Sequence, residues 1–149
     1  MRSRQGPTLV MFIHPHCPCT AASLVQLGEI ARHKAFHAVT AYLLITDVTD
    51  CLSGDNVALA RNIPGAVVLV DSQNAEAQRF GGSTSGATFI FDPAGRLAFD
   101  GGITAARGHQ GENQASAAAL AAIQGSSDGS VRMPVFGCAL SSAGDYTVD

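Results

Sequence analysis

Long apolar runs and clustered positive charge are both missing from this 149-residue sequence. Without a run of about 18 apolar residues, the chain as given has no predicted membrane span. The formal net charge is −3 and the nine lysine and arginine residues are scattered, so no basic surface is predicted for binding nucleic acid. A signal peptide is not visible, because residues 1–7 lead straight into the first apolar run. This start suits either a cytosolic protein or the trimmed soluble part of an exported or anchored one.

Cysteine is also scarce. Four cysteines with uneven spacing are too few for a disulfide-scaffold protein. An apolar content of 46% and a charged content of 14% indicate a globular chain, and its length suits a single domain over residues 1–149. Cys17 and Cys19 lie one residue apart at a predicted strand–helix junction, which favours reactivity over a purely structural role.

Short apolar runs alternate with segments of helical periodicity. Strands are predicted over 8–14, 39–46 and 66–70, and helices over 20–34, 56–62, 73–80 and 112–124. The turn Asp92-Pro93-Ala94-Gly95 joins strands 87–91 and 96–99 into a β-hairpin. This alternation predicts an α/β fold, with a mixed and mainly parallel sheet, flanking helices and the terminal hairpin as an antiparallel edge.

The predicted junction gives Cys17 and Cys19 a chemical role. Free N–H groups and the macrodipole at a helix N-terminus stabilise a thiolate, which is the nucleophilic form of cysteine. Pro18 stiffens the link, and a Cys-x-Cys disulfide closes a smaller ring than Cys-x-x-Cys, so it should be more strained and more oxidising. A pair of buried structural cysteines is the weaker interpretation. The motif therefore predicts thiol–disulfide exchange.

The residues around this motif resemble a known family. The segment Phe12-Ile13-His14-Pro15-His16-Cys17-Pro18-Cys19, followed by Ala22-Ser23-Leu24, resembles the active-site segment of TlpA- and ResA-type thioredoxins, and more closely the bacterial thioredoxin-like family often labelled RedB. The similarity continues over nearly the whole chain, through residues 84–86, 92–97, 101–104, 107–109 and 134–138. It implies a thioredoxin-like fold and a periplasmic or other extracytoplasmic setting, often with a membrane tether upstream. The thiol–disulfide oxidoreductase predicted from the cysteine motif needs no cofactor and would have a protein thiol or disulfide as its partner.

Two departures from thioredoxin bear on the chemistry. An ungapped match puts Thr20 where the second cysteine of Cys-x-x-Cys belongs, and Ser85-Gly86 where a cis-proline normally precedes the hairpin. Because that proline presents backbone to a peptide and helps exclude metal, its replacement weakens the case for a general dithiol reductase. A peroxidase that uses Cys17, with Thr20 nearby, ranks last among the hypotheses because no arginine is convincingly placed.

Other polar residues are expected near the cysteines. In a thioredoxin-like fold the loop over 101–113 returns to the active-site edge, which makes Arg107 and His109 available to lower the pKa of a thiolate. His16 is the flanking candidate for the same tuning, and Ser85 and Gly86 are expected to form the opposing substrate loop. The alternative for Arg107 and His109, weighed about evenly, is an ordinary solvated loop.

Cys138 is a third candidate for the redox site. The last predicted helix runs away from the junction for roughly 20 Å, but the fourteen residues from Gly125 to Cys138 can span up to about 46 Å. The tail over 125–149 can therefore fold back toward the active site, with Cys138 as resolving cysteine for Cys17 or Cys19. The alternative is a small buried side chain that anchors the tail.

Metal binding is the competing function. His14, His16, Cys17 and Cys19 offer soft or borderline ligands that suit copper or zinc, with His109 and Cys138 as further candidates. Sco-type copper proteins, which share the thioredoxin-like fold, provide a precedent by resemblance. Cys51 has no partner nearby in sequence and is interpreted as a lone structural cysteine.

Overall fold

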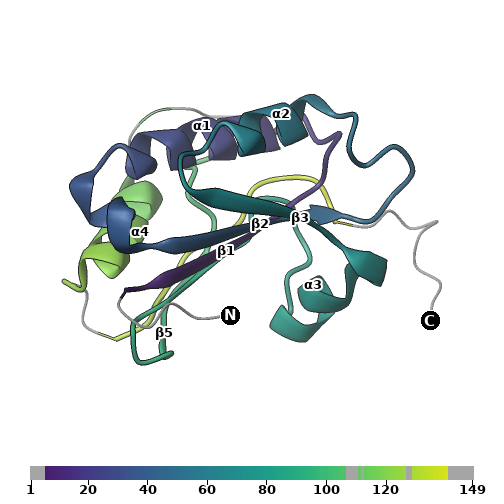
Figure 1. Ribbon diagram of the computed structural model, residues 1–149. Coiled ribbons are helices and arrows are strands. Elements are labelled where there is room, and N and C mark those ends of the chain that lie inside the picture. Colours follow the sequence, from purple (N-terminus) through teal and green to yellow (C-terminus); the bar gives the residue numbers. More distant parts are fainter. Residues whose placement is uncertain (1–5, 107–110, 112, 127–128, 141–149) are drawn as a thin grey trace.

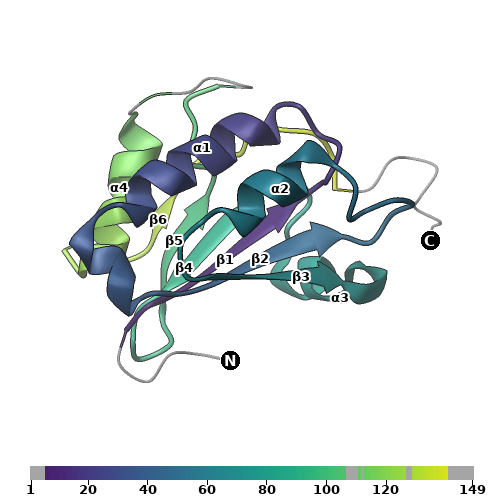
Figure 2. The same ribbon diagram turned by 45° about the horizontal axis from the view of Figure 1, so that its top comes forward.

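The computed structural model describes residues 6–106, 111, 113–126 and 129–140. Within them, a six-stranded sheet has the order β3-β2-β1-β4-β5-β6 (Figures 1 and 2; all six strands are labelled in Figure 2). The strands are β1 (Thr8–Ile13), β2 (Thr40–Thr46), β3 (Ala66–Asp71), β4 (Thr88–Phe91), β5 (Leu97–Gly101) and β6 (Val131–Arg132). The α-helices are α1 (Thr20–Ala31), α2 (Asp55–Arg61), α3 (Ala75–Phe80) and α4 (Gln114–Gln124), and two 3-10 turns cover Lys34–Ala38 and Ser72–Asn74. The predicted α/β class is confirmed.

The sheet mixes parallel and antiparallel pairs. β1 and β2 are parallel, as are β2 and β3, whereas β4 runs antiparallel to both β1 and β5. The hairpin was expected at the edge of the sheet, but β6 adds to β5 in parallel and takes the edge position. A two-residue strand has no periodicity to detect, and its place depends on pairing with a segment about 30 residues away in sequence.

The central strand β1 contributes to two hydrophobic cores. Successive side chains of a strand point to opposite faces of the sheet. Leu9, Met11 and Ile13 therefore join the larger core with residues of α1, α2 and α4, whereas Val10 and Phe12 join a smaller core on the α3 side. Figures 1 and 2 show α1, α2 and α4 on one face of the sheet and α3 on the other. This packing fixes the end of β1, from which the turn that carries Cys17 and Cys19 begins.

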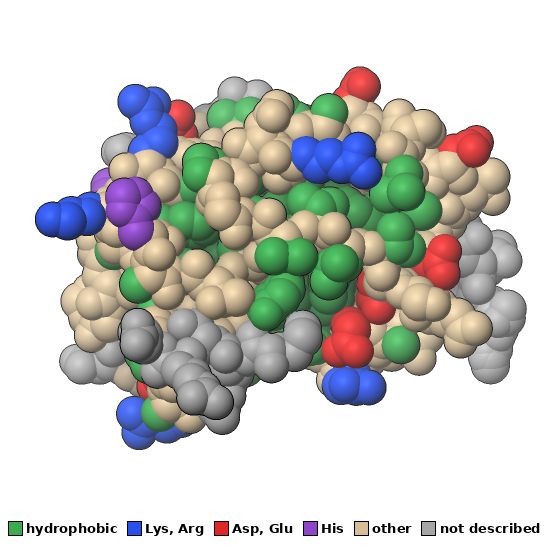
Figure 3. All heavy atoms as spheres, in the orientation of Figure 1, with side chains coloured by type: hydrophobic (Ala, Val, Ile, Leu, Met, Phe, Trp, Pro, Cys, Tyr) green, Lys and Arg blue, Asp and Glu red, His purple; other side chains and the backbone are tan. Residues whose placement is uncertain are grey.

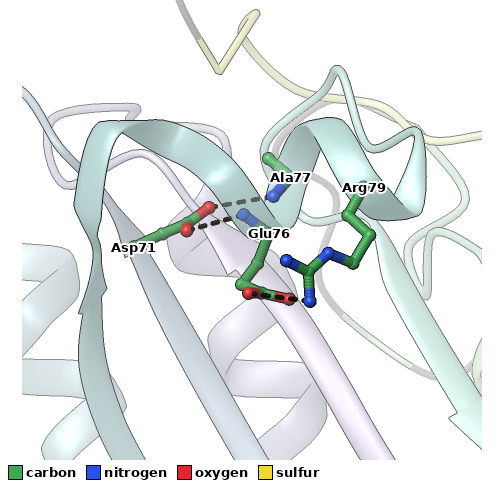
Figure 4. A network of polar contacts seen from close by, with 4 residues as sticks. All are labelled: Asp71, Glu76, Ala77 and Arg79. Atoms are coloured by element: carbon green, nitrogen blue, oxygen red, sulfur yellow. Dashed lines mark hydrogen bonds and ion pairs between the residues drawn. The ribbon is translucent and has the colours of Figure 1, made fainter.

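Helix α3 begins later than the sequence predicted. The expected helix over 73–80 is interrupted because Gln73 and Asn74 have a φ of 56°. Asp47 stabilises this kink: its carboxylate accepts the Gln73 N–H at 2.8 Å, and its own N–H donates to Asn74 Oδ1 at 2.9 Å. Asp71 then accepts the N–H groups of the first turn of α3, as Figure 4 shows, and thereby holds this helix against the smaller core.

The edge strand β3 leaves apolar surface exposed. Its outward side chains Val67 and Leu69 are 42% and 44% exposed. A groove of about 640 Å³ next to it is lined by side chains that include Tyr42, Leu69 and Phe80. In Figure 3, hydrophobic side chains gather near the middle of the face on which β3 lies in Figure 1. The smaller core is therefore only partly covered.

Candidate active site

Cys17 and Cys19 lie at the predicted strand–helix junction. β1 ends at Ile13, and Cys19 is the N-cap residue of α1. Cys17 is buried, with 2% of its surface exposed, and Cys19 is half-buried. A cleft of about 340 Å³, lined by residues 15–18 and 53–56, borders the turn. Of the two cysteines, Cys17 is therefore the enclosed one.

Asn56 fixes the shape of this turn from the first turn of α2. Its buried amide group donates to the carbonyl oxygen of Cys17 at 2.7 Å and to that of His14 at 3.0 Å. Asn56 could not be predicted from the sequence, because no local pattern links it to a turn about 40 positions earlier. Asn56 positions the cysteine without contacting its sulfur.

Replacing Asn56 with alanine is expected to lower the free energy of unfolding by about 1–2 kcal/mol. The loss stays at the lower end because each carbonyl retains one backbone donor, Cys17 N–H for His14 and Thr20 N–H for Cys17. Urea denaturation followed by circular dichroism measures the effect. Asn62→Ala, at an exposed position after α2, is the matched control. Equal stabilities for the two variants would contradict the role of Asn56.

The C-terminal segment passes over two glycines on its way to the turn. After β6, the Met133 N–H donates to the Asp100 carbonyl at 2.9 Å and the Gly102 N–H donates to the Pro134 carbonyl at 3.2 Å. A Cβ atom on Gly101 would overlap the backbone of Met133, and one on Gly102 would lie 2.8 Å from the Pro134 oxygen. The absence of side chains at these two positions lets the segment run close to β5.

This segment brings Cys138 to Cys17. The backbone N–H of Cys138 donates to the Cys17 sulfur at 3.3 Å, across 121 residues of sequence. A side-chain hydrogen bond also joins the two cysteines. The Cys138 carbonyl in turn accepts the Ser85 N–H at 2.8 Å. The structure thus places Cys138, Ser85 and Cys17 together.

A chain of hydroxyl groups reaches Cys17 from the other side. The His14 N–H donates to Ser85 Oγ at 2.8 Å, and Ser85 Oγ lies 2.5 Å from Thr20 Oγ1. Thr20 is fully buried and its side chain hydrogen-bonds to Cys17. A thiolate only accepts hydrogen bonds, so the Thr20 hydroxyl donates to the sulfur. The Ser85 hydroxyl then donates to Thr20 Oγ1. The hydrogen bonds therefore run in one direction, from the His14 N–H through Ser85 and Thr20 to the Cys17 sulfur.

These contacts decide the pKa of Cys17. Burial raises the pKa of the thiol, because desolvation disfavours the charged form. The hydrogen bonds from Cys138 and Thr20 oppose burial and outweigh it, so the pKa lies below its ordinary value. Cys17 also lies just before the N-terminus of α1, where the helix dipole favours a negative charge and so lowers the pKa of the thiol further. A lowered pKa increases the fraction of Cys17 in the thiolate form, which is the nucleophilic form of cysteine.

The other predicted residues are placed as follows. Gly86 has a φ of +97°, and its N–H donates to the carbonyl of Phe12 at 2.7 Å. The Nε2 atom of the exposed His16 ring lies 3.5 Å from the Thr49 carbonyl oxygen, and His16 lines the cleft beside the turn. Cys51 packs against the larger core. Arg107 and His109 lie outside the described residues.

The metal hypothesis finds no support in the described part of the chain. There, no group of three or more histidine, cysteine, aspartate or glutamate side chains is arranged to hold a metal ion. The rings of His14 and His16 are 5.9 Å apart between centroids, and the His14 Nδ1 atom accepts the His16 backbone N–H at 3.1 Å. Cys17 is engaged instead by Cys138 and Thr20.

No family model and no curated protein matches the sequence. Among solved structures, a hypothetical protein from Sinorhizobium meliloti has a TM-score of 0.71 at 20% identity, covering 93% of this chain and 80% of that chain. The pneumococcal exposed lipoprotein thioredoxin Etrx1, from Streptococcus pneumoniae, has a TM-score of 0.55 at 16% identity, covering 83% and 87%. DsbF from Mycobacterium tuberculosis has a TM-score of 0.55 at 17% identity, covering 83% and 82%.

The resemblance to the RedB, TlpA and ResA proteins is not tested by these similarities and stays a prediction. What they establish is the architecture: the chain has a thioredoxin-like fold.

Proposed function

We propose that the protein is a thiol–disulfide oxidoreductase in which Cys17 is the nucleophile and Cys138 is the resolving cysteine. The observation that carries this proposal is the contact between the two residues, where Cys138 hydrogen-bonds to a Cys17 sulfur whose pKa is lowered. The similarity to a structure named a thioredoxin supports the same class of reaction.

The reaction balances without a cofactor. The Cys17 thiolate attacks one sulfur of a partner disulfide, and the other partner sulfur leaves as a thiolate. The Cys138 thiolate then attacks the Cys17 sulfur of the mixed disulfide and releases the second partner sulfur. The partner has gained two electrons, and the protein carries a Cys17–Cys138 disulfide. The reverse sequence oxidises a partner dithiol.

Cys138 is a better resolving cysteine than Cys19 for a geometric reason. A disulfide forms without strain only between cysteines whose backbones approach at a favourable separation and direction. Cys138 already approaches Cys17 from the separate segment that follows β6, whereas Cys19 follows Cys17 through a single proline and is the N-cap residue of α1. A Cys17–Cys19 bond would have to close the small ring of the Cys-Pro-Cys turn. We therefore assign the stable disulfide to Cys17 and Cys138.

The partner we propose is a protein thiol or disulfide in an extracytoplasmic compartment. This setting rests on the resemblance stated above and on the similarity to an exposed lipoprotein. Within the part of the chain that the structure describes, no helix is both long and apolar enough to cross a bilayer. The direction of electron flow depends on the potential of the Cys17–Cys138 pair relative to that compartment.

A glutathione redox titration with differential alkylation tests the assignment. The metal-free protein is expected to show one two-electron transition, in which peptide mass mapping finds Cys17 linked to Cys138 and leaves Cys19 and Cys51 alkylated. The titration should not change when a chelator is added. A Cys17–Cys19 linkage would overturn the assignment of Cys138. Four cysteines that stay reduced across the whole range would contradict the oxidoreductase itself.

A further inference from the structure

We infer that the protein forms a two-fold symmetric dimer in which β3 pairs antiparallel with β3 of a second copy, with the two Val68 residues directly opposite each other. The inference does not depend on the proposed thiol chemistry. It concerns one edge of the sheet, whereas the turn that carries Cys17 follows β1, two strands further in.

The outer edge of β3 has none of the features that normally protect an edge strand. In the described part of the chain, β3 lies at one end of the sheet and pairs with β2 alone (Figure 2). Proteins block such edges with charged residues, prolines or bulges. The first five residues of β3 are alanine, valine and leucine only, and their register with β2 is uninterrupted. The free backbone groups of this edge therefore predict pairing with another strand.

The side chains of β3 match a second copy of the same strand. Val67 and Leu69 are exposed on the α3 face, and Val70 is 37% exposed on the opposite face. Directly opposite residues of an antiparallel pair share a face of the sheet. In a pair centred on Val68, Val67 lies opposite Leu69 of the second copy, and Ala66 lies opposite its Val70. Each of these cross-strand pairs joins two apolar side chains, so the strand is its own complement.

The charges at the two ends of β3 favour the antiparallel orientation. Arg61 is exposed and ends α2, shortly before β3 begins. At the other end, β3 finishes at Asp71, and the exposed Asp47 is hydrogen-bonded to the turn that follows. Antiparallel pairing brings the Arg61 end of each copy to the acidic end of the other, whereas parallel pairing would align like charges. A register centred on Leu69 would put Asp71 opposite Val67, so the centre at Val68 is preferred.

A two-fold axis perpendicular to the sheet makes this assembly closed. It keeps α3 of both copies on the same face, so the exposed pair Val67 and Leu69 continues across the interface into the same pair of the second copy. The groove lined by Tyr42 and Phe80 lies beside it on each side. Since the interface uses the β3 edge of both copies, and β6 at the other edge has only two residues, the sheet does not extend further. The product is a dimer and not a fibre.

Sedimentation velocity of the fully reduced protein tests the dimer, because the reductant excludes intermolecular disulfides. The wild type is expected to change from monomer to dimer between about 1 μM and about 1 mM, the range of a small interface. Val67→Lys and Leu69→Asp should each raise the dimer Kd at least about tenfold, because each puts a charge opposite an apolar side chain. Leu97→Lys, at a 37% exposed position on β5, is the control and should match the wild type.

A mixture of the Val67→Lys and Leu69→Asp proteins tests the register. In the mixed dimer the new lysine lies opposite the new aspartate, and the unchanged leucine lies opposite the unchanged valine. The mixture should therefore form a dimer at concentrations where each variant alone is monomeric. Circular dichroism checks that both variants fold.

Three results would overturn the inference: a wild type that is monomeric throughout, a wild-type dimer that neither variant weakens, or a mixture that stays monomeric. The first needs no variant and so holds even if a substitution prevents folding. The glutathione titration of both variants should reproduce the Cys17–Cys138 transition of the wild type. Loss of the dimer with that transition intact leaves the oxidoreductase standing, and a dimer without the transition leaves only the interface.

Discussion

Replacing Cys138 with serine is expected to trap the protein as a mixed disulfide through Cys17. In this variant Cys17 still attacks the partner, because Thr20 and the Cys138 backbone N–H still stabilise the thiolate. The second step loses its intramolecular thiolate and must wait for an external thiol. Since a well-placed internal group outcompetes an external one by a wide margin, turnover should fall at least about 100-fold. Intact-protein mass spectrometry of the variant with a model disulfide detects the trapped adduct.

The matched controls are Cys19→Ser and Cys51→Ser. Each removes one thiol from the same protein, whereas the hydrogen bonds that lower the pKa of Cys17 come from Cys138 and Thr20. Both controls should turn over within a few-fold of the wild type and should not accumulate the adduct. If Cys19→Ser accumulates the adduct and Cys138→Ser does not, Cys19 is the resolving cysteine and the contact with Cys138 serves only to tune Cys17.

The pattern of the sequence was sufficient to predict the framework of this site. The apolar run of β1, the Pro- and Cys-rich turn and the helical spacing of α1 are local features, so they place Cys17 and Cys19 at a helix start. The span of the chain after α4 allowed Cys138 to return. The length of this span did not determine whether Cys138 would contact Cys17 or Cys19. The choice depends on the pairing of β6 with β5 and on the backbone pairing of residues 83–85 with the C-terminal segment.

The contacts that sequence reasoning missed share one property, which is that they join residues far apart along the chain. Asn56 supports the active-site turn from the start of α2, and Thr20 and Ser85 meet across 65 residues. The sequence indicated Thr20 as the residue that replaces a cysteine and as a neighbour of Cys17 in the peroxidase hypothesis, but not as a hydrogen-bond donor to the sulfur. Its role as a donor to Cys17 becomes visible when the fold places Ser85 behind it. Pairwise hydrogen bonds of this kind have no periodicity and hence no sequence signal.

Replacing Thr20 with valine is expected to raise the pKa of Cys17 and slow its alkylation at low pH by about tenfold, the size expected for one lost hydrogen bond to a charged group. Valine keeps the β-branched shape at this fully buried position and removes only the hydroxyl. The rate constant of iodoacetamide labelling of Cys17, measured from pH 4 to pH 10 with peptide mapping, follows the thiolate fraction. Thr46→Val, which removes a buried hydroxyl bonded to the Ile13 carbonyl, is the control.

The sign of the effect distinguishes this explanation from a general structural defect. Below the pKa of both proteins the variant has less thiolate, so it reacts more slowly than the wild type. Above both pKa values the thiolate is complete in each, and the variant should react at least as fast, because nucleophilicity rises with the pKa of the thiol. Ser85→Ala should shift the profile in the same direction but less, since the Thr20 hydroxyl keeps its bond to Cys17. A variant that is slower at every pH, or a Ser85→Ala effect larger than that of Thr20→Val, would show that the hydroxyl chain does not act through the sulfur.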